Sequence, residues 1–107
     1  MADDDLEWLS QWHLAQCDEY WEHRFGVTIE SLDNPGWSLV VDLEGTPLQD
    51  RPFEPIRDNV DDREAEQGPA GDARWMVCRR EGLKFMGFGG PRDLGRLIGV
   101  FRAWAAS

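Results

Sequence analysis

The stretch GVTIESLDNPGWSLVVDL, residues 26–43, contains two alternating segments on either side of a turn. Residues 27–32 alternate in polarity and are rich in β-branched side chains, as strands are. Residues 37–43 place every other side chain on one apolar face. Between the two segments, Pro35 fixes φ and Gly36 permits a positive φ, which is the chemistry of a tight turn. The stretch therefore predicts a β-hairpin.

Helical periodicity is found on both sides of this hairpin. Residues 4–21 carry large apolar side chains at steps of three or four, and acidic residues at the start suit the helix dipole. A second helix is expected after Pro91, which suits a first turn. Its apolar stripe consists of Leu94, Leu97, Ile98, Phe101 and Trp104. Gly95 and Gly99 lie inside this helix, so close packing against a sheet is expected there.

The remaining chain predicts further strands and one long loop. Residues 51–58 predict a short strand, and Pro52 and Pro55 favour an edge position for it. Residues 73–90 contain two more strand-like segments joined by a short turn. Residues at about 58–72 are polar, rich in glycine and charge, and without periodicity. We expect them to form a mobile loop.

Together these elements predict one domain spanning residues 1–107. A chain of this length can bury a single core. The predicted fold class is α+β: an antiparallel meander sheet of about five strands, with the N- and C-terminal helices packed on one face as a two-layer domain. The other sheet face would stay open, and a partner could sit there.

The charge of the chain is strongly negative and unevenly distributed. The formal net charge is −10, and residues 1–66 hold 18 of the 21 acidic residues but four of the 11 basic ones. Nucleic acid and anionic membranes are poor ligands for such a surface, because both require Lys and Arg. A protein partner with a basic surface is the electrostatic complement.

The sequence contains fewer indications of the cellular compartment and of the oligomeric state. The N-terminus has neither a basic segment nor an apolar run, so no signal peptide is expected. No stretch approaches the length of a membrane helix, and two cysteines do not form a disulfide framework. We therefore expect a cytoplasmic protein with free thiols. The sequence does not reveal the oligomeric state.

Metal and thiol chemistry receive little support. His13 and Cys17 are four residues apart on the first helix, but a structural zinc site needs a second pair, which the chain lacks. We expect no metal and no cofactor. Rhodanese-like and phosphatase-like loops place an arginine after four or five residues beyond the catalytic cysteine, and neither Cys17 nor Cys78 has one there. A carboxylate pair drawn from Glu22, Glu30, Asp33 and Asp42 is conceivable, but such pairs are common in an acidic chain.

The aromatic residues are concentrated in the acidic part of the chain. Trp8, Trp12, Tyr20, Trp21 and Trp37 all lie in the first third. Tryptophan among carboxylates is typical of protein-binding hot spots. Some of these side chains must also fill the core, so both roles stay open for Trp21 and Trp37.

The chain contains a set of short motifs at a particular spacing. In the first half they are Trp8-Leu9, Trp12, Gln16-Cys17, Trp21-Glu22-His23, Gly26, the strand Val27 to Leu32, and Leu32-Asp33-Asn34-Pro35-Gly36-Trp37. In the second half they are the strand Trp75 to Cys78, Phe85, Gly89-Gly90-Pro91, Phe101 and Trp104. With these features the chain resembles the immunity protein 53 family of bacterial polymorphic toxin systems.

The resemblance implies an immunity protein that binds and neutralises a cognate toxin in the cytoplasm of the producing cell and is not an enzyme. Two alternatives stay open: a small cytoplasmic enzyme that uses carboxylates or Cys17, with sulfurtransferase-like activity, and a generic adaptor domain. The residues expected to bind the partner are Trp21, Glu22, Asp33, Asn34, Trp37 and Asp42. Within this group, the apolar strand face places Trp37 in the core by default, whereas Asp42 points to the opposite face.

Overall fold

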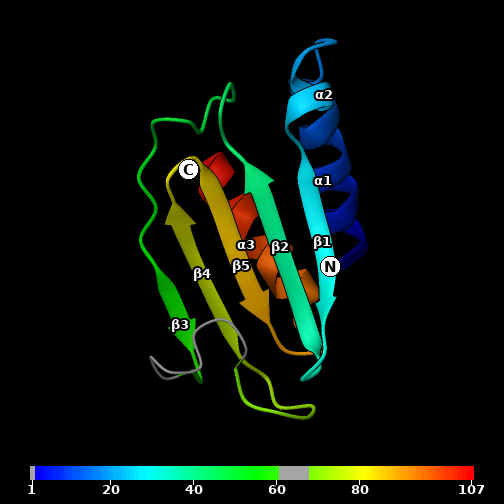
Figure 1. Cartoon of the computed structure of the whole chain (residues 1–107), viewed down its shortest axis with the longest axis vertical. Helices are drawn as coiled ribbons and strands as arrows, with labels where there is room; N and C mark the ends of the chain where they lie inside the picture. Colours follow the sequence, from blue (N-terminus) through cyan, green and yellow to red (C-terminus); the bar gives the residue numbers. More distant parts are fainter. Residues whose placement is uncertain (1, 61–67) are drawn as a thin grey trace.

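The structure of the chain is a computed structural model that describes residues 2–60 and 68–107. The elements are α1 (Ala2–Gln16), α2 (Trp21–Arg24), β1 (Val27–Leu32), β2 (Gly36–Asp42), β3 (Ile56–Asp58), β4 (Met76–Glu81), β5 (Lys84–Gly89) and α3 (Leu94–Ala106). Helix α3 lies behind the centre of the sheet, and α1 lies behind its β1 side (Figure 1). None of the helices formed by the described residues is long and apolar enough to cross a membrane.

The predicted α+β class with an open five-stranded antiparallel sheet is confirmed. The strand order is β1-β2-β5-β4-β3, so it departs from the predicted meander at one step, where β2 pairs with β5 instead of β3. The reason is the connection after β2, which leaves the sheet and runs to the β4 side of it. There the guanidinium group of Arg80 on β4 donates to the carbonyls of Leu48, Gln49 and Arg51, which fixes this connection next to β4.

The core lies between the sheet and the two terminal helices. Leu39 and Val41 of β2, Phe85 of β5, and Leu97 and Phe101 of α3 have no exposed surface. The fully buried strand residues alternate along their strands, as the hairpin pattern predicts. One apolar cluster therefore joins all layers of the domain.

Glycines on β5 allow α3 to approach the sheet closely. A Cβ atom at Gly87 would lie 3.2 Å from the side chain of Leu97, and one at Gly89 would lie 3.5 Å from it. Gly99 of α3 instead lies against α1, where a Cβ atom would come within 3.5 Å of the carboxylate of Asp5. Gly99 thus packs against α1 and not, as expected, against the sheet.

The predicted helix over residues 4–21 is two helices. Helix α1 ends at Gln16, and Glu19 has a φ of +76°, which no helix accommodates. The chain then turns and starts α2 at Trp21. The break matters because it changes the direction in which the following side chains point.

The two outer strands of the sheet differ. Strand β3 is an edge strand, as Pro52 and Pro55 predicted, and it has three residues. Strand β1, the other edge, has six. The mobile loop predicted at about 58–72 falls partly on residues 61–67, which lie outside the described part of the chain.

Hydrogen bonds hold the described residues on both sides of that segment. The side-chain amide of Asn59 donates to the carbonyl of Arg74 at 2.9 Å. The N–H group of Gly71 donates to the carbonyl of Asn34 at 2.8 Å. The second bond links the described end of the loop to the β1–β2 turn.

Candidate functional site

The six residues predicted to bind a partner form two groups at opposite ends of β2. Trp21, Glu22 and Asp42 lie at one end, and Asp33, Asn34 and Trp37 lie at the other. Seven strand residues separate these ends by roughly 20 Å. The predicted residues therefore do not converge on a single cavity.

Trp21 is a packed side chain with a satisfied indole N–H. Its exposed fraction is 5%. The Nε1 atom donates to the carbonyl of Glu44 at 2.8 Å, and the ring packs edge-on against Trp12 with centroids 6.3 Å apart. Trp21 thus fixes α2 to the connection that follows β2.

Glu22 and Asp18 form a reciprocal cap at the start of α2. The Glu22 carboxylate accepts hydrogen bonds from the N–H groups of Asp18 at 3.0 Å and Glu19 at 2.9 Å. The Asp18 carboxylate accepts from the N–H groups of Tyr20 and Trp21, both at 2.9 Å. These bonds hold the strained turn before α2 in place.

Backbone hydrogen bonds also lower the pKa of both capping carboxylates. For Asp18 the N–H groups of Trp21 and Tyr20 lower the pKa below its usual value. For Glu22 its own N–H group acts first, followed by those of Asp18 and Glu19. Hydrogen bonding to the charged form favours that form. Both groups consequently stay ionised, with their oxygens engaged inside the fold.

Asp42 connects β2 to β5 and to Gly26, the residue before β1, on the helix-free face. One carboxylate oxygen accepts from the N–H group of Gly26 at 2.9 Å, and the other accepts from the ammonium of Lys84 at 2.7 Å. The side chain is half-buried. It borders an open hollow of about 250 Å³ at this end of the sheet. Asp42 does point away from the core, but its charge is paired.

At the opposite end of β2, Trp37 and Asn34 are also tied to other segments. The Trp37 indole N–H donates to the carbonyl of Pro91 at 3.1 Å, and its half-buried ring packs against the core. The Asn34 carbonyl accepts the bond from Gly71 described above. Asp33 is exposed and forms no ion pair with a described residue. Of the six predicted residues, Asp33 is the one whose charge is directed to solvent.

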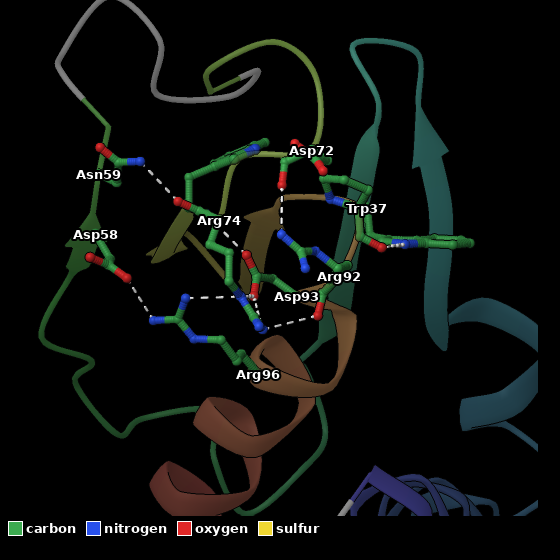
Figure 2. A network of polar contacts seen from close by, with 10 residues as sticks. Trp37, Asp58, Asn59, Asp72, Arg74, Arg92, Asp93 and Arg96 are labelled. Carbon is green, nitrogen blue, oxygen red and sulfur yellow. Dashed lines mark hydrogen bonds and ion pairs between the residues drawn. The ribbon is translucent and has the colours of Figure 1, made fainter.

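A buried carboxylate that was not predicted from the sequence organises this same end of the molecule (Figure 2). Asp93 has no exposed surface and precedes α3. It accepts hydrogen bonds from Nε and Nη2 of Arg74 at 2.9 and 2.6 Å, and from the N–H group of Trp75 at 3.0 Å. Arg96 lies 3.6 Å away and also pairs with Asp58 at 2.8 Å. Asp93 therefore joins β3, β4 and α3.

Burial would raise the pKa of Asp93, but the hydrogen bonds from Arg74 and Trp75 and the nearby charges outweigh burial and lower it. The charged form is thus held inside the protein by its partners. Asp93 follows Gly-Gly-Pro at the start of a predicted helix, so an N-terminal cap could have been expected from the sequence. Its carboxylate makes no cap bond to α3, because Arg74 and Trp75 occupy it.

Both cysteine thiols have a raised pKa. Partial burial, and then the carboxylates of Glu22 and Asp18, raise the pKa of Cys17. Burial raises the pKa of Cys78 to about 12. In residues 2–60 and 68–107, no group of three or more His, Cys, Asp or Glu side chains is arranged to hold a metal ion.

The helix-free face of the sheet is only partly accessible. Near the Asp93 end, Trp75, Val77 and Phe88 are buried, and a Cβ atom at Gly68 would lie 2.2 Å from the Trp75 ring. Exposure on this face increases toward β1, where Thr28 and Glu30 are open to solvent. The accessible polar surface of the sheet therefore lies along its β1 side.

Basic and acidic side chains differ in how many of them form ion pairs or hydrogen bonds with other described residues. Hydrogen bonds or ion pairs to other described residues are formed by the basic residues Arg51, Arg74, Arg79, Arg80, Lys84, Arg92, Arg96 and Arg102. The exposed carboxylates that form no ion pair with a described residue are Asp4, Glu7, Asp18, Glu19, Glu30, Asp33, Glu44, Asp50, Glu54 and Asp72. Among the basic residues, Arg74, Arg79, Lys84, Arg96 and Arg102 form ion pairs, so the unpaired exposed carboxylates leave a negative surplus on the described surface.

These features define a small α+β domain with an acidic outer surface and with its conspicuous polar groups committed to the fold. A family model described as immunity protein 53 matches residues 6–106. The chain belongs to this family, and the expected resemblance is confirmed. Searches of curated proteins and of solved structures found no match.

Proposed function

We propose that this protein is a non-catalytic immunity protein that binds and neutralises a cognate toxin with a basic surface, in the cytoplasm of the cell that makes both. Membership of the immunity protein 53 family supports an immunity role. The observation that carries the electrostatic part is the surplus of exposed carboxylates without ion-pair partners among the described residues. Such a surface attracts a basic partner and raises the rate of association.

The placement of the predicted residues supports two different roles in binding. Asp33, exposed at the β1–β2 turn, is proposed to contact the toxin directly. The other predicted residues, Trp21, Glu22, Asn34, Trp37 and Asp42, are proposed to act mainly by holding the surrounding segments in position, because each makes contacts inside the fold.

The same contacts bear on the enzyme alternative. A thiolate nucleophile needs a lowered pKa, whereas the pKa values of Cys17 and Cys78 are raised. Asp93, the most buried carboxylate, is fully engaged with Arg74 and Trp75. These observations favour inhibition by binding over catalysis.

Co-expression tests the proposed function. The toxin encoded beside this protein is induced in a sensitive host, with and without this chain. We expect growth to be restored only when the chain is present, and purified complex to weaken as the salt concentration rises. If the toxin kills equally well in both strains, the proposal is wrong.

A further inference from the structure

The β1 edge of the sheet is long and unprotected. Natural edge strands are usually short or interrupted by proline, lysine or a bulge. Strand β3 follows this rule: it has three residues and comes directly after Pro55. Strand β1 has six residues without proline or lysine and pairs continuously with β2, with no bulge. The two edges are therefore treated differently by the fold.

The hydrogen-bond register shows which backbone groups of β1 face outward. The N–H group of Asp42 donates to the carbonyl of Gly26 at 3.0 Å, so these opposite residues form a hydrogen-bonded pair. Such pairs alternate along an antiparallel ladder. The backbone groups of Thr28 and Glu30 therefore face β2, and those of Val27, Ile29 and Ser31 point to the free edge.

An apolar hollow lies beside this free edge, between β1 and α1. Its volume is about 290 Å³, and its lining includes Leu6, Leu9 and His13 of α1 with Val27 and Ile29 of β1. Leu6 is 53% exposed and Ile29 is 38% exposed, so large aliphatic surface is left uncovered. A strand added next to β1 would place alternate side chains over this hollow.

The charges around the edge indicate the chemistry of the occupant. Glu30 projects from the other face of β1, and Asp33 follows the strand; both are exposed and form no ion pair with a described residue. A second copy of the chain would bring a further net charge of −10 to this edge. A basic segment is the complementary occupant.

We propose that an extended segment of the toxin, alternating apolar and basic residues, pairs with β1 as a sixth strand. Its apolar side chains enter the hollow between α1 and β1, and its basic side chains face Glu30. Main-chain bonds to Val27, Ile29 and Ser31 supply much of the affinity, and the hollow selects the side chains. This inference rests on the proposed function and assigns the surface through which it acts.

Residue-resolved amide hydrogen exchange of this protein, alone and with the toxin encoded beside it, tests the proposal. The edge amides of Ile29 and Ser31 should exchange at least about tenfold more slowly in the complex. The amides of Thr28 and Glu30 serve as internal controls, because β2 already protects them. Unchanged exchange at Ile29 and Ser31 in a formed complex would overturn the edge proposal while leaving the proposed function intact.

Two matched variants test the hollow separately. Ile29→Glu places a charge in it, whereas Thr28→Glu makes the same charge change on the opposite side of the same strand, where the basic side chains of the toxin would lie. We expect Ile29→Glu to weaken toxin binding at least about tenfold relative to Thr28→Glu, a difference of about 1.4 kcal/mol. Both variants should keep the circular dichroism spectrum of the parent. Equal effects of the two variants would contradict the proposal.

The remaining outcomes also decide the question. If the toxin does not bind the parent protein at all, the proposed function fails and the edge proposal fails with it. If Ile29 and Ser31 are already protected without toxin and the protein sediments as a dimer, a second copy occupies the edge and the toxin-strand proposal is wrong.

Discussion

The carboxylate of Asp93, which has no exposed surface, accepts two hydrogen bonds from the guanidinium group of Arg74 at 2.9 and 2.6 Å. The two residues are 19 positions apart and lie on either side of the β4–β5 hairpin. Their pairing joins the segment entering β4 to the start of α3. Stability should therefore depend on this contact more than on any exposed ion pair.

Asp93→Asn should lower the free energy of unfolding by about 2 kcal/mol, because hydrogen bonds to charged groups contribute about that much. Asp72→Asn is the matched control, since the Asp72 side chain is exposed and contributes only its backbone carbonyl to Arg92. Urea denaturation measures both. A loss of equal size in the two variants would show that the Asp93 contact is unimportant.

The pH dependence of the free energy of unfolding should reveal the ionisation of Asp93. The pKa of Asp93 lies below its ordinary value in the folded protein. The ionised Asp93 therefore stabilises the fold fully at pH values well above its ordinary pKa of about 3.9. This stabilisation is lost as the pH falls below that ordinary pKa toward the lower pKa of the folded protein. The stability gap between the parent and Asp93→Asn should narrow between pH 7 and pH 3. Asp18 and Glu22 titrate in both proteins, so they cancel in the comparison.

Two glycines with similar backbone angles should respond differently to alanine. Gly68 has a φ of +68° and Gly71 a φ of +80°, so both substitutions strain the backbone. A Cβ atom at Gly68 would also lie 2.2 Å from the Trp75 ring, whereas one at Gly71 meets nothing within 4 Å. Gly68→Ala should cost about 1–3 kcal/mol more than Gly71→Ala. Equal melting temperatures would mean that the Trp75 ring moves freely.

Substitutions of Trp37 separate its packing from its hydrogen bond. Trp37→Phe keeps a ring against the core and loses the bond to Pro91, at a cost of about 1 kcal/mol. Trp37→Ala should cost about 2–4 kcal/mol, because it also empties packed volume. Denaturation curves and toxin binding are measured together. If Trp37→Ala is as stable as the parent but no longer binds toxin, Trp37 is a partner contact and not a core residue.

Charge reversal at Asp33 should affect binding and not folding. Asp33→Lys is expected to weaken toxin binding about tenfold or more, mainly at low salt, with a melting temperature within a few degrees of the parent. Asp50→Lys makes the same change at an exposed carboxylate in the connection between β2 and β3. Equal weakening by both variants would indicate that net charge matters and that position does not.

Local patterns predicted the strands and failed where distant partners decide the structure. The alternation in residues 27–32 and 37–43 gave the β1–β2 hairpin to within a residue. The pairing of β2 with β5 carries no local signal, because it depends on a connection held by Arg80 from another strand. The first helix was predicted too long because the cap formed by Asp18 and Glu22 overrides apolar periodicity.

The candidate site shows the same limit. Residue type identified Trp21, Glu22 and Asp42 as notable, and each of them does make distinctive contacts. The sequence could not show that those contacts lie inside the fold, because Trp21 binds a carbonyl 23 positions away and Asp42 binds an ammonium 42 positions away. Asp93 was not predicted for the same reason, because its partner Arg74 lies 19 positions away on a different segment.

The unequal edges of the sheet limit where a further strand can be added. Strand β3 is short and follows a proline, whereas β1 is long, so strand addition is favoured at the β1 edge. Because copies of this chain cannot join through both edges, strand addition at β1 does not lead to a filament of this chain.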